Sequence, residues 1–181
     1  MTRIASLDPA TTTGHAGELL AATQKQLGRA PNLYRSMAQS PIALEAYLAF
    51  RGVLTKGALS SKMMERIALL TAVMNDCEYC VAAHSFRGSK IGMSEQELSM
   101  TRAGLADTEK DSAALHFVQN MMRHRGITSD GEFLALKKAG WNDIEIGEMI
   151  AHVALNVFSN YFNHVAQPAL DFPAVEQLNP A

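Results

Sequence analysis

The chain has 181 residues, of which 48% are hydrophobic, and its 16 Lys and Arg against 18 Asp and Glu give a formal net charge of −2. A chain of this size and composition can bury a substantial core, so we expect one domain, residues 1–181, that needs no disulfide staples. The small net charge creates no field that attracts polyanions, which argues against nucleic acid or an anionic membrane as a partner.

The N-terminal segment offers no secretory signal, because Asp8 and Glu18 interrupt it and no apolar core follows a basic start. No apolar stretch elsewhere approaches the roughly 20 residues of a membrane span. We therefore expect a cytoplasmic protein. Thiols are kept reduced in the cytoplasm, so Cys77 and Cys80, the only cysteines, favour a catalytic, redox-sensing or metal-binding role over a structural disulfide.

Helical signals dominate from about residue 16 onward, after an N-terminal stretch, 1–15, that we interpret as an extended arm. Several expected helices open near proline and stop near glycine, while Ser60 or Ser61 provides an N-cap before the cysteines. Ser94 with Glu97 three residues later predicts a capping box. In chain order, the expected helices fall within 15–28, 31–41, 41–57, 60–76, 77–92, 93–104, 108–126, 129–140 and 141–169.

No window shows the strict alternation or the clusters of Val, Ile and Thr that are typical of strands. We therefore expect an all-α domain of about eight or nine helices, packed as a compact bundle with a CxxC pair at the start of a central helix. The residues with chemical potential concentrate in one core motif, residues 60–92.

The stretch NDCEYCVAAH places Cys77, Cys80 and His84 on one face of the helix that begins at Cys77. Unpaired amide groups and the helix dipole favour a thiolate in that first turn. His84 lies one turn beyond Cys80 but two turns, about 10 Å, beyond Cys77, so the imidazole can exchange a proton most easily with Cys80. A helical CxxC also brings two sulfurs within bridging reach.

Glu65 belongs to the preceding expected helix, and hairpin geometry brings it to the level of His84. The residues after Arg66 are apolar nearly all round, which indicates a buried helix. A carboxylate on its inward side needs a partner such as His84.

Two other interpretations of these residues stay open at this point. The cysteines are also compatible with two small core residues that happen to be three apart. They are compatible with a zinc site too, although Glu65 would have to complete a ligand set whose other members come from one helix. No second CxxC and no HxxxH motif is present to complete a tetrahedral site, so we expect no resident metal. No GxGxxG motif is present either, so we expect no nucleotide cofactor.

With Glu65, eleven intervening residues, CxxC and then three residues before His84, the sequence resembles the carboxymuconolactone decarboxylase superfamily and, within it, the alkylhydroperoxidase D (AhpD) type. The stretch LGRAPNLYRSMAQSPIALEAYLAF is similar to the leader helices of the peroxidase-related branch. The resemblance implies an all-helical fold, assembly into homotrimers or hexamers, and peroxiredoxin-type activity. It makes Cys80 the peroxidatic thiol, Cys77 the resolving thiol, and Glu65 with His84 a proton relay.

The chain departs from that pattern at Tyr79, because the founding members have a relay histidine at this position. We expect Tyr79 to donate a hydrogen bond to a peroxide or to the thiolate. The substitution raises the question of whether peroxidase turnover is weaker in this protein.

We therefore expect a thiol-dependent alkyl hydroperoxidase or disulfide oxidoreductase. The chain has no third cysteine, so an external dithiol protein, thioredoxin-like or lipoyl-bearing, would have to reduce its disulfide. One alternative is an acid/base enzyme like carboxymuconolactone decarboxylase, whose activity would not need the cysteines. The other is a non-enzymatic helical oligomer that senses oxidants or binds a metal.

The last expected helix carries a polar stripe along an otherwise apolar sequence. His152, Asn156, Asn160 and His164 follow one another at i, i+4 spacing. Such a stripe can line a substrate pocket or a subunit contact, or it can form hydrogen bonds within the core. We include His152 and Asn156 among the candidate pocket residues.

Overall fold

A computed structural model describes residues 1–175 of the chain, and within them the secondary structure consists of helices without strands. This confirms the expected all-α fold. Among the described residues no helix is both long and apolar enough to cross a membrane. The helices are α1 (Gly14–Leu27), α2 (Asn32–Met37), α3 (Pro41–Leu54), α4 (Ser61–Met74), α5 (Glu78–Lys90), α6 (Glu95–Arg102), α7 (Glu109–Arg123), α8 (Asp130–Lys138) and α9 (Asp143–Ala166).

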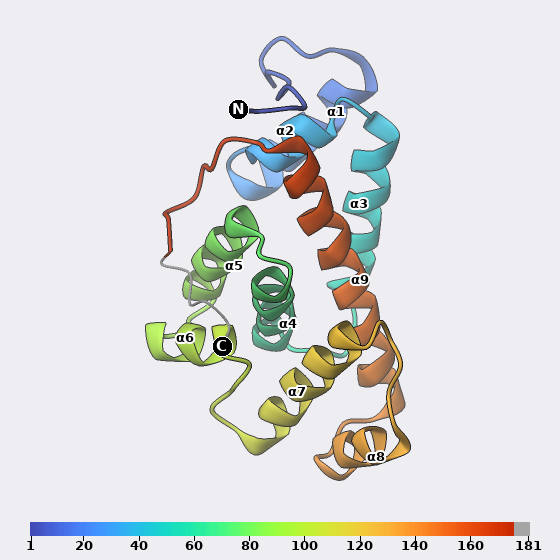
Figure 1. Cartoon of the computed structure of the whole chain (residues 1–181). Coiled ribbons are helices and arrows are strands. Elements are labelled where there is room, and N and C mark those ends of the chain that lie inside the picture. The colour runs from blue at the N-terminus through green and yellow to red at the C-terminus, as the bar shows by residue number, and fades with distance from the viewer. Residues whose placement is uncertain (176–181) are drawn as a thin grey trace.

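The antiparallel hairpin of α4 and α5 lies at the centre of the molecule (Figure 1). Helices α1 to α3 gather at one end of the hairpin and α6 to α8 at the other, while the long helix α9 packs along α4 and α3. Two clusters of buried apolar residues result. Helix α4 contributes Leu69 to one cluster and Ile67 to the other, so it is the element that joins them.

The helix boundaries follow from local capping chemistry. Ser60 accepts a hydrogen bond from the Met63 amide at the start of α4, and Ser94 forms the expected capping box with Glu97 at the start of α6. The N-terminal arm is shorter than expected, because α1 begins at Gly14. The amide of Arg3 donates to the Ala166 carbonyl, which ties the arm to the end of α9.

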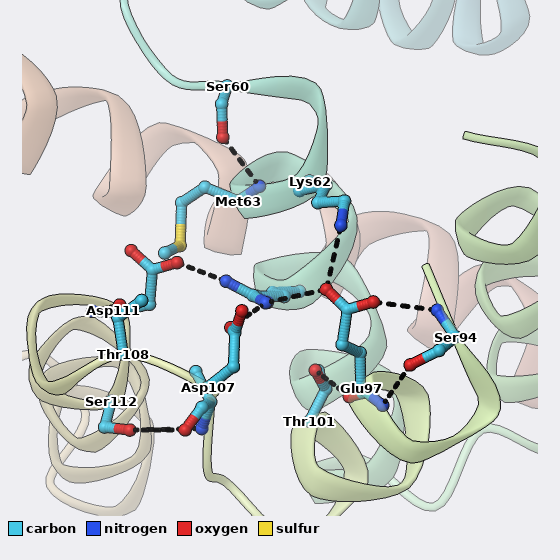
Figure 2. Close-up of polar contacts among 12 residues, drawn as sticks. Ser60, Lys62, Met63, Ser94, Glu97, Thr101, Asp107, Thr108, Asp111 and Ser112 are labelled. Atoms are coloured by element: carbon cyan, nitrogen blue, oxygen red, sulfur yellow. Dashed lines mark hydrogen bonds and ion pairs between the residues drawn. The ribbon is translucent and has the colours of Figure 1, made fainter. Parts of the chain in front are cut away.

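A cluster of ionic side chains joins α4 to α6 and α7 (Figure 2). Arg66 is 3% exposed and forms ion pairs with Glu97, Asp107 and Asp111. Lys62 donates a second charged hydrogen bond to Glu97, over 2.8 Å. Removing a guanidinium from water is costly, and the three carboxylates offset that cost, so this cluster holds α6 and α7 to one side of α4.

Candidate active site

The turn between α4 and α5 sets the position of the two cysteines. Asn75 ends α4, and Asp76 has a left-handed backbone conformation with φ of 52°, which reverses the chain. The ψ of Cys77 is 88°, which is not helical, so Cys77 is the N-cap of α5. The helix begins at Glu78, one residue later than expected. Cys80 is therefore the third residue of the helix, where backbone amides are unpaired.

Cys77 and Cys80 form a disulfide with their Cα atoms 5.2 Å apart, so the described state is the oxidised one. Both are buried, at 2% and 3% exposed. When the bond is reduced, the amide groups and the dipole at the start of α5 stabilise a thiolate on Cys80.

Glu65 and His84 meet between the two central helices, at the level predicted by the hairpin geometry. Nδ1 of His84 lies 2.7 Å from Oε2 of Glu65. Burial by itself raises the pKa of Glu65, but the charge and hydrogen bond of His84, with the charges of Arg87 and Arg51, lower it below its ordinary value. An ionised Glu65 that accepts from Nδ1 leaves Nε2 of His84 as the nitrogen that can take up a proton.

Two cavities meet at His84. A small one of about 20 Å³ is lined by Cys80 but not by Cys77, together with His84 and Asn163. A larger one of about 200 Å³ shares Tyr47, His84 and Arg87 with it and includes Glu65 in its wall. Cys80 is thus the sulfur that a substrate can approach, and His84 lies in the wall of both cavities.

Asn163 of α9 is a site residue that the sequence did not reveal. Its Nδ2 donates to Sγ of Cys80 over 3.0 Å, while its Oδ1 is buried without a partner among the described residues. The only sequence signal was its place one turn beyond Asn160 on the polar face of the last helix. A donor aimed at sulfur stabilises negative charge there, so Asn163 favours the thiolate form of Cys80.

The family model of the carboxymuconolactone decarboxylase family matches residues 41–120, a segment that contains Glu65, Cys77, Cys80 and His84. The match covers less than half of the chain, and it shows a likeness in the segment that carries these four residues. None of the curated proteins matches the chain.

Solved structures share the fold over nearly the whole chain. An uncharacterized peroxidase-related protein from Ralstonia eutropha JMP134, described as an alkylhydroperoxidase AhpD core, is 21% identical with a TM-score of 0.84, covering 94% of this chain and 92% of its own. A peroxidase-related protein from Silicibacter sp. TM1040 is 20% identical with a TM-score of 0.77, covering 92% of each chain.

A third structure with the same fold carries a different kind of name. The debrominase Bmp8, in a cysteine-to-alanine variant bound to 2,3,4-tribromopyrrole, is 16% identical with a TM-score of 0.80, covering 94% of this chain and 92% of its own. At these identities the structures establish the fold of this chain as that of the AhpD core. They do not establish its substrate.

Tyr79, the position where the chain departs from the founding family members, is turned toward a different partner than we expected. Its hydroxyl donates to Oδ1 of Asp171 over 2.6 Å and accepts from the Leu33 amide over 3.1 Å. Burial, with Asp171 as the next cause, raises the pKa of Tyr79 far above its ordinary value. We expected the Tyr79 hydroxyl to donate its hydrogen bond to a peroxide or a thiolate. It donates to Asp171 instead, and burial together with this carboxylate keeps the phenol neutral.

Tyr79 and Asp171 thereby fix a segment, residues 167–175, that we call the C-terminal strap. Arg29 forms an ion pair with Asp171 over 2.7 Å, and its guanidinium lies 4.4 Å from the centre of the Phe172 ring. Phe172 packs edge-on against Tyr79 and lines the small cavity beside Cys80. The strap therefore covers the small cavity beside Cys80.

The polar stripe of α9 divides into two halves with different contacts. His152 and Asn156 line the larger cavity, as we expected for pocket residues. Asn160 instead accepts a hydrogen bond from Asn75, and His164 contacts the Asn75 carbonyl over 2.6 Å, so these two hold the turn before Cys77. Burial lowers the pKa of His152, whose Nε2 is buried without a partner within residues 1–175.

The described part of the chain contains no group of three or more His, Cys, Asp or Glu side chains arranged to hold a metal ion. The four candidate residues do not form such a set, because Glu65 is hydrogen-bonded to His84 and the two sulfurs are bonded to each other. Their arrangement is one that can move a proton and exchange a disulfide.

Proposed function

We propose that this protein is a thiol-dependent peroxidase of the AhpD type that reduces organic hydroperoxides with Cys80 and Cys77. The observation that carries the proposal is the combination of a CxxC disulfide with a buried Glu65–His84 pair whose free imidazole nitrogen adjoins the cavity at Cys80. The family-model match over residues 41–120, together with the fold shared with peroxidase-related proteins, supports a peroxidase-related role in general.

The reaction starts from the reduced protein. His84 takes the proton of the Cys80 thiol, and Glu65 stabilises the imidazolium that forms. The thiolate sulfur attacks the terminal oxygen of the hydroperoxide, the O–O bond breaks, and the alkoxide takes the proton from His84 to leave as an alcohol. Cys80 is then a sulfenic acid, which is two electrons more oxidised than the thiol.

Cys77 completes the cycle as the resolving thiol. Its sulfur attacks the sulfur of the sulfenic acid, the S–O bond breaks, and the hydroxide takes the Cys77 proton to leave as water. The disulfide in the structure is the product of this step. A dithiol protein, thioredoxin-like or lipoyl-bearing, then reduces the disulfide by exchange.

Thiol counting tests the proposal. Reduced protein is mixed with one equivalent of cumene hydroperoxide, and free thiols and cumyl alcohol are measured. We expect both thiols to disappear as one alcohol forms, with Cys77→Ser accumulating a sulfenic acid that dimedone traps. Free thiols that persist in the wild type, or oxidation that is unchanged in Cys80→Ser, would contradict the mechanism.

The competing functions give different results in the same preparation. An acid/base enzyme of the decarboxylase kind keeps its activity when both cysteines are serine. A sensor forms the disulfide but does not turn over in excess dithiothreitol, and elemental analysis of the purified protein identifies a metal-binding protein. Because the debrominase Bmp8 shares the fold, release of bromide from 2,3,4-tribromopyrrole in the presence of dithiol is measured as well.

A further inference from the structure

The side chains that line the larger cavity beside His84 carry more positive than negative charge. Arg51 from α3 and Arg87 from α5 line it, and Glu65 is the only carboxylate among its lining residues. The oxygen of that carboxylate is already engaged by His84. With both histidines neutral, two positive charges therefore face one negative charge around a space that a small molecule can occupy.

Neither guanidinium forms an ion pair with a carboxylate in the described part of the chain. Arg51 has no side-chain hydrogen bond there either, and Arg87 has one long contact, 3.5 Å, to the Tyr34 hydroxyl. Arg66, one residue after Glu65, shows the contrast, because three carboxylates surround it. The donors of Arg51 and Arg87 are thus free to bind a ligand.

The charges of both arginines reach the centre of the site. Arg87 and Arg51 each lower the pKa of Glu65, although it is hydrogen-bonded to His84 rather than to them. His152 adds a further polar group, since its buried Nε2 has no partner within residues 1–175 and the residue lines the same cavity. A cavity with free donors and a positive potential is suited to an anion.

Part of the remaining wall is apolar, formed by Met64, Ala68, Ile91 and Leu155, and the volume of the cavity is about 200 Å³. A purely inorganic anion would leave this apolar surface uncovered. An organic acid of about the size of a substituted benzoate places its carboxylate on the arginines and its carbon skeleton on the apolar wall.

We propose that Arg51 and Arg87 form a carboxylate subsite, so that the substrate is a small carboxylate-bearing hydroperoxide rather than a neutral one. This inference rests on the proposed peroxidase function for its reactive group, while binding of the acid itself does not. Because Arg87 and His84 line both cavities, a carboxylate held by the subsite places the hydroperoxide group next to the space beside Cys80.

A matched pair of substrates tests the inference. The carboxylate compound is 4-(2-hydroperoxypropan-2-yl)benzoic acid, and its methyl ester is the neutral counterpart. With reduced wild-type protein we expect the acid to oxidise the thiols roughly tenfold faster or more at low concentration, the size of effect given by one charge-assisted hydrogen bond. Arg51→Gln should remove that preference, while Arg51→Lys should retain part of it.

Lys56→Gln is the control variant, because Lys56 is exposed, lies five residues from Arg51 and does not line the cavity. It removes the same charge and should leave the preference unchanged. An equal loss of rate for acid and ester in Arg51→Gln, or a preference that survives in both Arg51→Gln and Arg87→Gln, would overturn the subsite.

Calorimetry with 4-isopropylbenzoate, which has no peroxide group, separates this inference from the proposed function. We expect binding to the wild-type protein that weakens roughly tenfold in Arg51→Gln. Binding without any thiol oxidation by either hydroperoxide supports the subsite and contradicts the peroxidase function. Oxidation by both hydroperoxides at equal rates, with no benzoate binding, supports the peroxidase function and contradicts the subsite.

Discussion

Two neighbouring residues of α4, Glu65 and Arg66, show how differently one helix can use a charged side chain. They are about 100° apart around the helix axis, so they face different neighbours. Arg66 faces α6 and α7 and is surrounded by Glu97, Asp107 and Asp111. Glu65 faces α5, where it binds one partner, His84, at the edge of a cavity.

The difference lies in what each neighbourhood leaves unused. On the Arg66 side, each carboxylate has a cation, and Glu97 also caps α6. On the Glu65 side, the imidazole has a free nitrogen, Asn163 has an unpartnered oxygen within the described residues, and two arginines have no carboxylate. Charges that are neutralised serve stability, while polar groups left free beside a cavity are available for chemistry.

Glu65→Gln tests whether the Glu65–His84 pair takes part in proton transfer. The amide cannot stabilise the His84 imidazolium, so we expect the rate of Cys80 oxidation by cumene hydroperoxide to fall about 100-fold or more. The free energy of unfolding should change little, because a glutamine of the same shape still accepts from Nδ1. Stopped-flow measurement of thiol loss gives the rate.

Glu78→Gln is the matched control for that experiment. Glu78 is exposed, lies between the two cysteines and has no contact with His84, so removing its charge should not slow oxidation. Equal rates for Glu65→Gln and the wild type would show that the pair takes no part in proton transfer.

Arg66→Met tests whether the ion pairs of Arg66 stabilise the fold. The variant leaves three carboxylates without their shared cation, and we expect the free energy of unfolding to fall by about 3 kcal/mol. The thiol oxidation rate of the protein that remains folded should be unchanged. Urea denaturation measures the first quantity, and Arg123→Met, which alters an exposed arginine, is the control. A stable Arg66→Met protein that oxidises slowly would reverse the assignment of the two sides.

Much of the fold and part of the site were predictable from sequence, because their determinants are local. Caps at Ser60 and Ser94 set helix boundaries within one or two residues. Glu65 and His84 lie on consecutive helices, so the length of the turn between them fixes their relative level, and a 1.5 Å rise per residue is enough to pair them.

The rest of the site depends on contacts between segments that are distant in sequence. Asn163 reaches Cys80 across 83 positions and Asp171 reaches Tyr79 across 92, and no periodicity encodes such pairs. Arg51 and Arg87 are single cations on separate helices, and they meet only because α3 and α5 both border the larger cavity. The hydrogen-bond partner of Tyr79 was not predictable for the same reason, since Asp171 lies in the C-terminal strap, although Tyr79 does line the small cavity at Cys80.

Glu97→Gln tests how the charge of Glu97 contributes to stability at different pH values. The Lys62 hydrogen bond, followed by those of Ser94, lowers the pKa of Glu97 from 4.5 to about 2. A lowered carboxyl pKa contributes stability that is complete above about pH 4.5 and is lost as the pH falls toward 2. We expect the variant to be less stable by about 1 to 2 kcal/mol at neutral pH and equally stable near pH 2.

Glutamine still completes the capping box with Ser94, so the pH dependence isolates the charge. Glu109→Gln, at the first position of α7, removes an exposed carboxylate that has no ion pair within residues 1–175, and it should change stability little at any pH. A difference between Glu97→Gln and the wild type that is the same at pH 2 and pH 7 would show that the carboxylate acts through shape and not through its ionic partners.

The smallest expected effect concerns the C-terminal strap, which covers the small cavity beside Cys80. Cys77 and Cys80 are nearly inaccessible, so a reductant reaches the disulfide only when a covering segment opens. Asp171→Ala removes the hydrogen bonds from Tyr79 and the Asn32 amide and the ion pair with Arg29. Opening then becomes more favourable by about 1 kcal/mol, and reduction by dithiothreitol should be about fivefold faster.

Asp143→Ala, which removes an exposed ion pair with Lys137, should leave that rate unchanged. An Asp171→Ala protein that is reduced at the wild-type rate would show that the contacts of Asp171 do not control the access of the reductant to the disulfide.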